Sequence, residues 1–296
     1  MNITRQQNIK LGIFYAIISA LSFALMSVLV KKIGNDLPTS MLIFFRFSIS
    51  LILLLPWVIK NPHFTFKIQQ PAQYIIRILA ALLGLFFVFY AIKFIPLVDA
   101  LLLNNTSPLF VPLIAWLLVG AKTPAKALFG IALGFVGIAI ILHPGLKIIS
   151  FASLIALASG LLVALAIVQM RLISKTSQTI QMLFYYFLVS TIISGIVAAL
   201  QWKSPIGYET WFLLLGIGIF GTLYQVVATM AYVTAPVRLI SPLIFLTVIF
   251  GGLFDWLIWG STPSLLTYIG TLLVIIGAII TIYFGQQSIK QSLPGD

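Results

Sequence analysis

Arg46 and the four polar residues 104–107 are the side chains whose type and position could do chemistry. Both lie inside long apolar stretches. A charge at such depth in a bilayer costs about 3 kcal/mol, so it normally has a partner or water. Arg46 could bind an anion or a carboxylate, or it could form a structural salt bridge or reach the outer headgroups. Candidate partners are Asp36, Asp99 and Asp255, and the sequence leaves these interpretations open.

The four polar residues are followed by Pro108 and Pro112. Proline has no N–H group, so Pro108 leaves the carbonyl of Asn104 without its helical partner. Unpaired backbone groups are tolerated at mid-membrane depth only where they face protein or a wet cavity. The pattern predicts a helix break that contacts substrate. A local repair, in which the hydroxyls of Thr106 and Ser107 cap backbone groups, is the alternative.

Weaker signals come from a proline and two aromatic stripes. Pro242, which follows a serine, is an imperfect counterpart of the break in the second half of the chain. Tyr224 and Tyr232 share a helix face because they lie eight residues apart, as do Phe86 and Tyr90 at a spacing of four. Such stripes could line an amphipathic cavity, although helix packing better explains any single aromatic residue.

Catalytic and metal-binding patterns are absent from the sequence. The two histidines, His63 and His143, have no carboxylate or histidine at ligand spacing, so no metal site is expected. The chain has no cysteine and no nucleotide-binding GxxxxGK(S/T) motif, and we expect no cofactor. An intramembrane enzyme would need a serine or aspartate at the depth of a histidine, and none is found.

Ten apolar stretches, most of them about 20 residues long, carry these side chains. A helix rises about 1.5 Å per residue, so about 20 residues cross a hydrocarbon core about 30 Å thick. With 61% hydrophobic and 7% charged residues, this 296-residue chain could not hide its apolar surface in a soluble domain. We predict an all-α integral membrane protein with ten transmembrane helices. Their expected bounds are 12–32, 39–59, 72–94, 97–119, 125–142, 150–171, 179–201, 208–233, 237–259 and 264–284.

The charges predict how these helices are oriented. With the N-terminus in the cytoplasm, eleven lysines and arginines fall on the cytoplasmic side and five on the outer side, as the positive-inside rule requires. Both termini are therefore expected to be cytoplasmic. The same bias accounts for the net charge of +12, so we expect no nucleic-acid partner. Four acids, Asp36, Asp99, Glu209 and Asp255, are expected outside, where they could favour cationic substrates or reflect the exclusion of basic residues.

The chain repeats itself at an offset of about 140 residues. Pro96 matches Pro236 and Trp116 matches Trp256. Further matched pairs are Gly120 with Gly260, Gly130 with Gly270, and Gly137 with Gly277. Each half holds five spans, an odd number, so the second half enters the membrane from the opposite side. We predict two inverted five-helix repeats, 12–142 and 150–284, the architecture of many secondary transporters.

Several motifs together resemble the drug/metabolite transporter superfamily, in particular its EamA-type ten-helix members, over residues 12–284. They are Phe44-Phe45-Arg46-Phe47, the segments 89–100 and 105–115 with their prolines, and the recurring glycines. The family usually has glutamate after the glycine that closes the fourth and ninth spans. Here Ala121 and Ser261 follow instead, which puts in doubt a helix-end contact but not the fold.

The resemblance implies an inner-membrane carrier for small metabolites, often amino acids or their relatives, that commonly works as an exporter. Spans 1, 3, 4, 6, 8 and 9 would surround a central cavity. On that mapping the cavity candidates are Ser19, Phe23, Phe86, Tyr90, Asn105, Ser107, Ser159, Gln225, Thr229 and Pro242, with Arg46, Pro108 and Tyr224 added from the residues above. Some relatives take up S-adenosylmethionine, a cation that Asp255 and Trp256 would suit.

These observations predict a secondary transporter, and no enzyme, that exports an amino acid or related small metabolite across the cytoplasmic membrane by alternating access. Uptake or exchange of an S-adenosylmethionine-like cation is one alternative. A lipid-intermediate flippase and an intramembrane enzyme are alternatives of other types. The expected partners are a small-molecule substrate and the lipid bilayer, with a homodimer left open.

Overall fold

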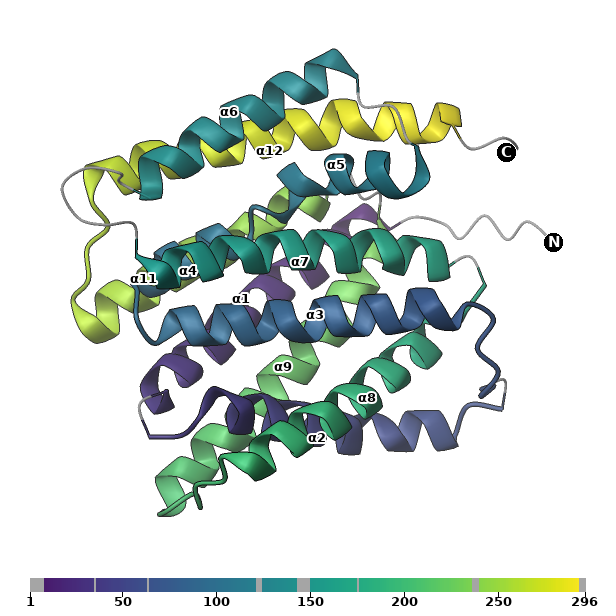
Figure 1. Cartoon of the computed structure of the whole chain (residues 1–296), viewed down its shortest axis with the longest axis vertical. Coiled ribbons are helices and arrows are strands. Elements are labelled where there is room, and N and C mark those ends of the chain that lie inside the picture. The colour runs from purple at the N-terminus through teal and green to yellow at the C-terminus, as the bar shows by residue number, and fades with distance from the viewer. Residues whose placement is uncertain are drawn as a thin grey trace.

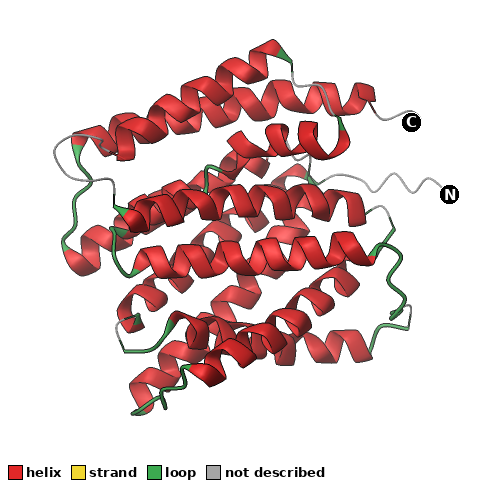
Figure 2. Ribbon diagram, viewed as in Figure 1, coloured by secondary structure: helices red, strands yellow, loops and turns green. Residues whose placement is uncertain are grey.

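The computed structural model describes residues 8–34, 36–62, 64–120, 124–142, 150–174, 176–235 and 240–292. These residues form helices joined by short turns, with no strand among them (Figure 2). The helices are α1 (Ile9–Ile33), α2 (Thr39–Ile59), α3 (Pro71–Ile92), α4 (Leu97–Asn104), α5 (Ser107–Val119), α6 (Ala125–Leu142), α7 (Phe151–Ile173), α8 (Thr179–Leu200), α9 (Tyr208–Thr234), the 3-10 helix η1 (Ser241–Phe245), α11 (Leu246–Trp259) and α12 (Leu265–Ser292).

Nine segments of the described chain are long and apolar enough to cross a membrane, counting α4 with α5 as one, and α6 is a shorter apolar helix. The ten expected spans are all present as helical segments. The largest differences are at the ends of the chain, where α1 begins at Ile9 and α12 continues to Ser292. Length and apolar character therefore predicted the number and order of the helices.

Local signals set several helix ends. The side chain of Asn8 accepts a hydrogen bond from Leu11 N at 3.1 Å at the start of α1. Pro71 is the first residue of α3, a position where its missing N–H has no helical partner to lose. The helices α5 and α11 both end at a glycine, Gly120 and Gly260, with a φ of 65°. Glycine adopts this left-handed conformation without a steric penalty.

The fourth and ninth spans are the two interrupted ones. The fourth is divided into α4 and α5 at Asn105 and Thr106, immediately before Pro108. The ninth span, expected as one helix over 237–259, begins in the described residues with η1, and the α-helical part starts at Leu246. Both breaks lie next to the sequence positions where a proline removes a backbone donor.

The helices pack in pairs that combine the first and second halves of the chain (Figure 1). α1 packs against α9, α3 against α7, α2 against α8, and α6 against α12. α6 and α12 meet through glycines, because a Cβ on Gly130 would lie 2.7 Å from Gly277 O and one on Gly137 would lie 2.7 Å from Gly270 O. Small residues allow the two backbones to approach closely, as in many membrane helix pairs.

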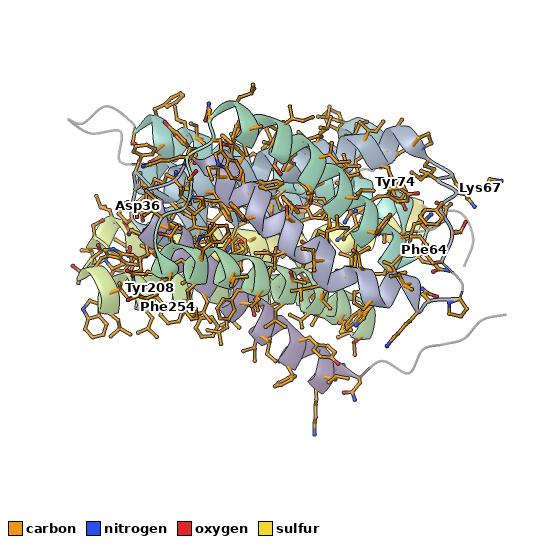
Figure 3. The ribbon with its side chains drawn as sticks, turned by 90° about the horizontal axis from the view of Figure 1, so that it is seen from below. Asp36, Phe64, Lys67, Tyr74, Tyr208 and Phe254 are labelled. Atoms are coloured by element: carbon orange, nitrogen blue, oxygen red, sulfur yellow. The ribbon has the colours of Figure 1, made fainter. Side chains whose placement is uncertain are left out.

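The two ends of the bundle differ in their residues. Figure 3 shows Asp36 and Tyr208 at one end and Phe64, Lys67 and Tyr74 at the other. The first end is formed by the end of α1 and the starts of α4 and α9. The second is formed by the starts of α1, α3 and α8 and the end of α12 (Figure 1). We call them the Asp36 end and the Lys67 end.

Candidate functional site

A cavity of about 430 Å³ lies between the helices of the two halves. Its walls come from α1, α2, α3, the α4–α5 break, α7, α8, α9, η1, α11 and α12. It extends toward the Lys67 end, where Arg171, Ser174 and Thr179 line it at the turn between α7 and α8. The volume is in the range of pockets that hold small molecules.

Nine of the fifteen cavity candidates line this cavity: Ser19, Phe23, Arg46, Asn105, Ser107, Pro108, Tyr224, Gln225 and Thr229. Phe23 from α1 and Tyr224 from α9 lie with their ring centroids 4.7 Å apart, so the halves of the chain share one aromatic wall. Residues as distant in sequence as Ser19 and Thr229 thus line one space.

Phe86, Tyr90 and Ser159 do not line the cavity. On α3 the lining residues are Arg77, Ala81, Leu85 and Val88, a single helical stripe. Phe86 lies one residue, or about 100°, beyond Leu85 on the helix and packs against the core. Tyr90 packs against Phe94 at 4.8 Å between ring centroids. Ser159 is fully buried and donates hydrogen bonds to Asn104 Oδ1 and Ala156 O.

Pro242, Asp255 and Trp256 also lie outside the cavity wall. In η1 and α11 the lining residues are Ile244 and Thr247, so Pro242 occupies a neighbouring position. Asp255 is fully buried at the Asp36 end, where its charge is paired with a lysine. The side chain of Trp256 is 54% exposed on the outside of the bundle. The expectation that these residues surround a cationic substrate therefore has no counterpart in the cavity.

The break between α4 and α5 combines a local repair with a contact across the bundle. Thr106 donates to Leu103 O at 2.6 Å, and Asn105 Nδ2 donates to Ile244 O in η1 at 3.5 Å. A Cβ on Gly160 of α7 would lie 2.7 Å from Leu103 O, so this glycine gives the break room to approach α7. The two interrupted spans meet here, on the cavity wall.

Two buried arginines from different helices line the cavity, Arg46 of α2 and Arg77 of α3. Arg46 is 1% exposed, and its Nε and Nη1 have no hydrogen-bond partner among the described residues. Its Cζ atom lies 4.1 Å from the ring centroid of Phe47 and 5.9 Å from that of Tyr186. Cation–π contacts of this kind stabilise a guanidinium without neutralising it.

Arg77 is not among the cavity candidates expected from the sequence, because it is one of the eleven basic residues expected on the cytoplasmic side. It is 5% exposed and donates from Nη1 to Met182 O at 3.2 Å. Its Cζ atom lies 5.5 Å from the ring centroid of Tyr186. The signal that could have revealed it is helical spacing, since Ala81 and Leu85 follow at intervals of four residues on the same face.

An ion pair joins helices at the Asp36 end of the bundle. Lys31 Nζ lies 2.5 Å from Asp255 Oδ1, and Asp255 Oδ2 accepts a hydrogen bond from Leu97 N at 2.9 Å. Asp255, one of the expected partners of Arg46, is therefore paired with Lys31. Lys31 also lies over the ring of Trp259, at 4.5 Å from its centroid.

A bundle of apolar helices around a partly polar cavity that extends toward one end is typical of a membrane transporter for small molecules. The chain belongs to the EamA-like transporter family, whose model matches residues 10–143 and again residues 150–283. The family confirms the resemblance seen in the sequence.

Relatives that carry functional names are similar over almost their whole length. The pseudopaline exporter CntI of Pseudomonas aeruginosa is 28% identical over 275 residues, which cover 92% of this chain and 95% of that protein. An S-adenosylmethionine uptake transporter of Rickettsia felis is 26% identical, with 95% of each chain covered. A riboflavin transporter of Vibrio cholerae is 23% identical, with 95% of this chain and 96% of that protein covered.

A solved crystal structure has the same fold, with a TM-score of 0.61 and 18% sequence identity, covering 94% of this chain and 97% of the other. Together, the family and its named members identify this chain as a multi-pass membrane transporter of the drug/metabolite type and not as an enzyme.

Proposed function

We propose that this protein is a secondary carrier that exports a small metabolite, an amino acid or related compound, across the cytoplasmic membrane by alternating access. The observation that carries the proposal is the cavity of about 430 Å³, which is lined by both halves of the chain and extends toward the Lys67 end. Two halves that rock about such a cavity would expose it to each side of the membrane in turn.

An inverted repeat, 12–142 on 150–284, is part of this proposal. The helix pairs support it, because α1 packs on α9 while α7, the counterpart of α1, packs on α3, the counterpart of α9. The glycines cross over in the same way: Gly130 contacts Gly277, although its match by sequence is Gly270. Such an exchange of partners is what a two-fold axis in the membrane plane produces.

The proposed direction rests on the charge bias and on the shape of the cavity. The positive-inside rule assigns the Lys67 end, with both termini, to the cytoplasm. The cavity extends toward that end, and the ion pair of Lys31 and Asp255 joins helices at the other. Substrate would then load from the cytoplasm, as export requires. The pseudopaline exporter among the relatives supports this direction, whereas the S-adenosylmethionine transporters are named for uptake.

Metabolite profiling tests the proposal. Cells that express the protein are compared with cells that express Ser107→Val, which replaces a cavity hydroxyl at the helix break by an apolar isopropyl side chain. We expect at least one metabolite to be depleted inside and enriched outside only with the natural protein. Accumulation inside would reverse the direction and favour uptake.

An unchanged metabolite profile, despite normal insertion of both proteins, would contradict metabolite export. The next assay would then be flipping of fluorescent lipid analogues in reconstituted vesicles. Flipping that Ser107→Val abolishes would replace the metabolite carrier by a lipid flippase. Asn105→Leu serves as a second variant, because Asn105 also lies on the cavity wall and its amide joins the break to η1.

A further inference from the structure

The charge inside the cavity has one sign. The lining residues include Arg46, Arg77 and Arg171, and no aspartate or glutamate is among the described residues that line it. Arg46 and Arg77 are buried, with 1% and 5% exposure. A charge removed from water without an opposite charge is costly, so this arrangement is expected where a ligand supplies the compensating charge.

The two buried arginines converge on one aromatic ring. The Cζ atoms of Arg46 and Arg77 lie 5.9 Å and 5.5 Å from the centroid of Tyr186, which itself lines the cavity. Arg46 is held through its contact with Phe47 and Arg77 through its bond to Met182 O. Each guanidinium is therefore oriented by protein contacts, and those of Arg46 use only part of its hydrogen-bonding capacity.

Arg46 has hydrogen-bond donor atoms that no described protein group uses. Its Nε and Nη1 are buried and have no hydrogen-bond partner among the described residues. A guanidinium presents its N–H groups as a planar fork that fits a carboxylate or a phosphate in a bidentate manner. Burial, lack of partner and position on the cavity wall together indicate a site made for an oxyanion.

We propose that the cavity binds an organic anion with two acidic groups, one held by Arg46 and the other by Arg77, beside Tyr186. This inference rests on the proposed function, because it names the substrate class of the same cavity. The rest of the wall suits the carbon skeleton: Phe23 and Tyr224 supply an aromatic surface, and Asn105 and Gln225 supply neutral polar groups. An S-adenosylmethionine-like cation would meet two arginines of its own sign.

The site is tested by ligand-dependent thermal stability of the purified full-length protein in detergent. The probes are malonate, succinate and glutarate, which differ only in the spacing of their carboxylates, and their neutral diamides at matched ionic strength. We expect at least one dicarboxylate to raise the melting temperature of the protein while its diamide does not. If no dicarboxylate exceeds its diamide, the proposal is wrong.

Variants connect the binding to the two arginines. Arg46→Gln and Arg77→Gln should each weaken binding of the stabilising dicarboxylate by about tenfold to a hundredfold, the loss typical of one charge-assisted hydrogen-bonded contact. Lys60→Gln removes the same charge from an exposed position at the end of α2, and it should bind like the natural protein. Equal weakening in all three variants would mean that the change in net charge alone explains the weaker binding, and it would overturn the proposal.

A ligand-binding role and a structural role for Arg46 predict opposite effects of Arg46→Gln on the melting temperature of the ligand-free protein. If Arg46 serves a ligand, Arg46→Gln removes an uncompensated buried charge and should leave the ligand-free melting temperature unchanged or higher. A lower ligand-free melting temperature together with an unchanged response to dicarboxylate would identify a structural residue and refute the site. Arg46→Lys keeps the charge, loses the planar fork and should bind with intermediate affinity.

The experiments on transport and on binding can refute the proposed exporter and the proposed anion site independently of each other. Arginine-dependent binding of a dicarboxylate without any metabolite export would leave the anion site standing and refute the exporter. Export of neutral or cationic metabolites that is insensitive to both Arg46→Gln and Arg77→Gln would leave the exporter standing and refute the anion site.

Discussion

Lys31 and Asp255 are 224 residues apart in the sequence and form an ion pair between the last turn of α1 and the last turns of α11. The same carboxylate accepts a hydrogen bond from Leu97 N at the start of α4. Three helices are thus joined at the Asp36 end by one buried side chain, which has no measurable exposure. A buried carboxylate left without its cation typically costs about 3–5 kcal/mol, so this junction stabilises helix packing at the Asp36 end.

If alternating access opens the Asp36 end, linking Lys31 to Asp255 should stop transport. The chain contains no cysteine, so Lys31→Cys/Asp255→Cys can be made in the natural background. A short bifunctional thiol reagent that reductant can cleave should lower flux by about tenfold or more, and reductant should restore it, because separation of two halves is required for each cycle.

The single variants Lys31→Cys and Asp255→Cys, treated with the same reagent, are the matched controls for loss of the ion pair itself. Full flux in the cross-linked double variant would show that the Asp36 end need not separate. Mass spectrometry of the intact protein measures the extent of cross-linking in the same vesicles.

The close approach of α7 to the break predicts a stability effect at Gly160. A Cβ added there would lie 2.5 Å from Thr106 Oγ1, 2.7 Å from Leu103 O and 3.1 Å from Asn104 O. Two of these atoms belong to the backbone, so Gly160→Ala should cost about 1–3 kcal/mol of unfolding free energy. Unfolding in denaturant with a retained m-value would measure it.

Gly84→Ala on the neighbouring helix α3 is the control for that substitution, because its Cβ would meet atoms of α7 only at ordinary contact distances of 3.4 Å. We expect it to leave stability within about 0.5 kcal/mol of the natural protein. Equal effects of the two alanines would mean that helix propensity, and not the contact with the break, decides the result.

Gly221 offers a way to move Arg46 without removing its charge. A Cβ at this position of α9 would lie 3.0 Å from Arg46 Cγ, Arg46 Nε and Met26 Sδ. These are atoms of flexible side chains, so Gly221→Ala should cost about 1 kcal/mol or less. Displacement of the guanidinium should nevertheless weaken dicarboxylate binding by about threefold to tenfold, since oriented contacts tolerate little misplacement.

Calorimetric binding measurements compare Gly221→Ala with the control Gly252→Ala. The added Cβ of Gly252→Ala lies 3.3 Å from Val98 Cγ2 and contacts no atom of Arg46, so the comparison separates displacement of Arg46 from the added bulk of a methyl group. Binding by Gly221→Ala at the natural affinity would argue against Arg46 as the ligand contact.

Lys93 gives the stability of the protein a predictable pH dependence. It follows the last residue of α3, and its Nζ donates to Leu37 O at 2.9 Å. Burial lowers the pKa of Lys93 from 10.5 to about 8. The folded protein therefore binds fewer protons than the unfolded chain between about pH 8 and 10.5, and this residue makes stability rise with pH across that window.

Below about pH 8 the amine is charged in both states, and the cost of burying it is fully present. Lys93→Met should thus raise the melting temperature at pH 7 relative to the natural protein, and the difference should shrink toward pH 10.5. Lys203→Met, at an exposed position after α8, should show no such pH-dependent difference. A constant difference for Lys93→Met at all pH values would contradict the lowered pKa.

Much of the fold followed from local properties of the chain. Apolar length gave the ten helical segments, Gly120 and Gly260 marked the ends of α5 and α11, and Pro108 marked the break in the fourth span. Such features can be predicted from sequence because a helix within the bilayer must satisfy the hydrogen bonds of its own backbone, whatever its neighbours are. The family followed from motifs that are continuous in sequence.

The sequence predicts only some of the residues that line the cavity. Asn105 and Ser107 were found because polar residues beside a proline in an apolar span are conspicuous. Phe86 and Tyr90 were assigned to the cavity although the lining stripe of α3 passes through Leu85 and Val88 instead. In a helix that is apolar all round, periodicity does not say which face meets the cavity and which meets lipid.

The sequence by itself determined the membrane class, the helices, the repeat pattern and the family, because these depend on composition and on residues close along the chain. Only the tertiary structure decided that Asp255 pairs with Lys31, leaving Arg46 without that partner, and that Arg77 joins Arg46 beside Tyr186. A buried charge pairs with an opposite charge that lies near it in space. Which helices far apart in sequence lie near each other is set by how the whole bundle packs.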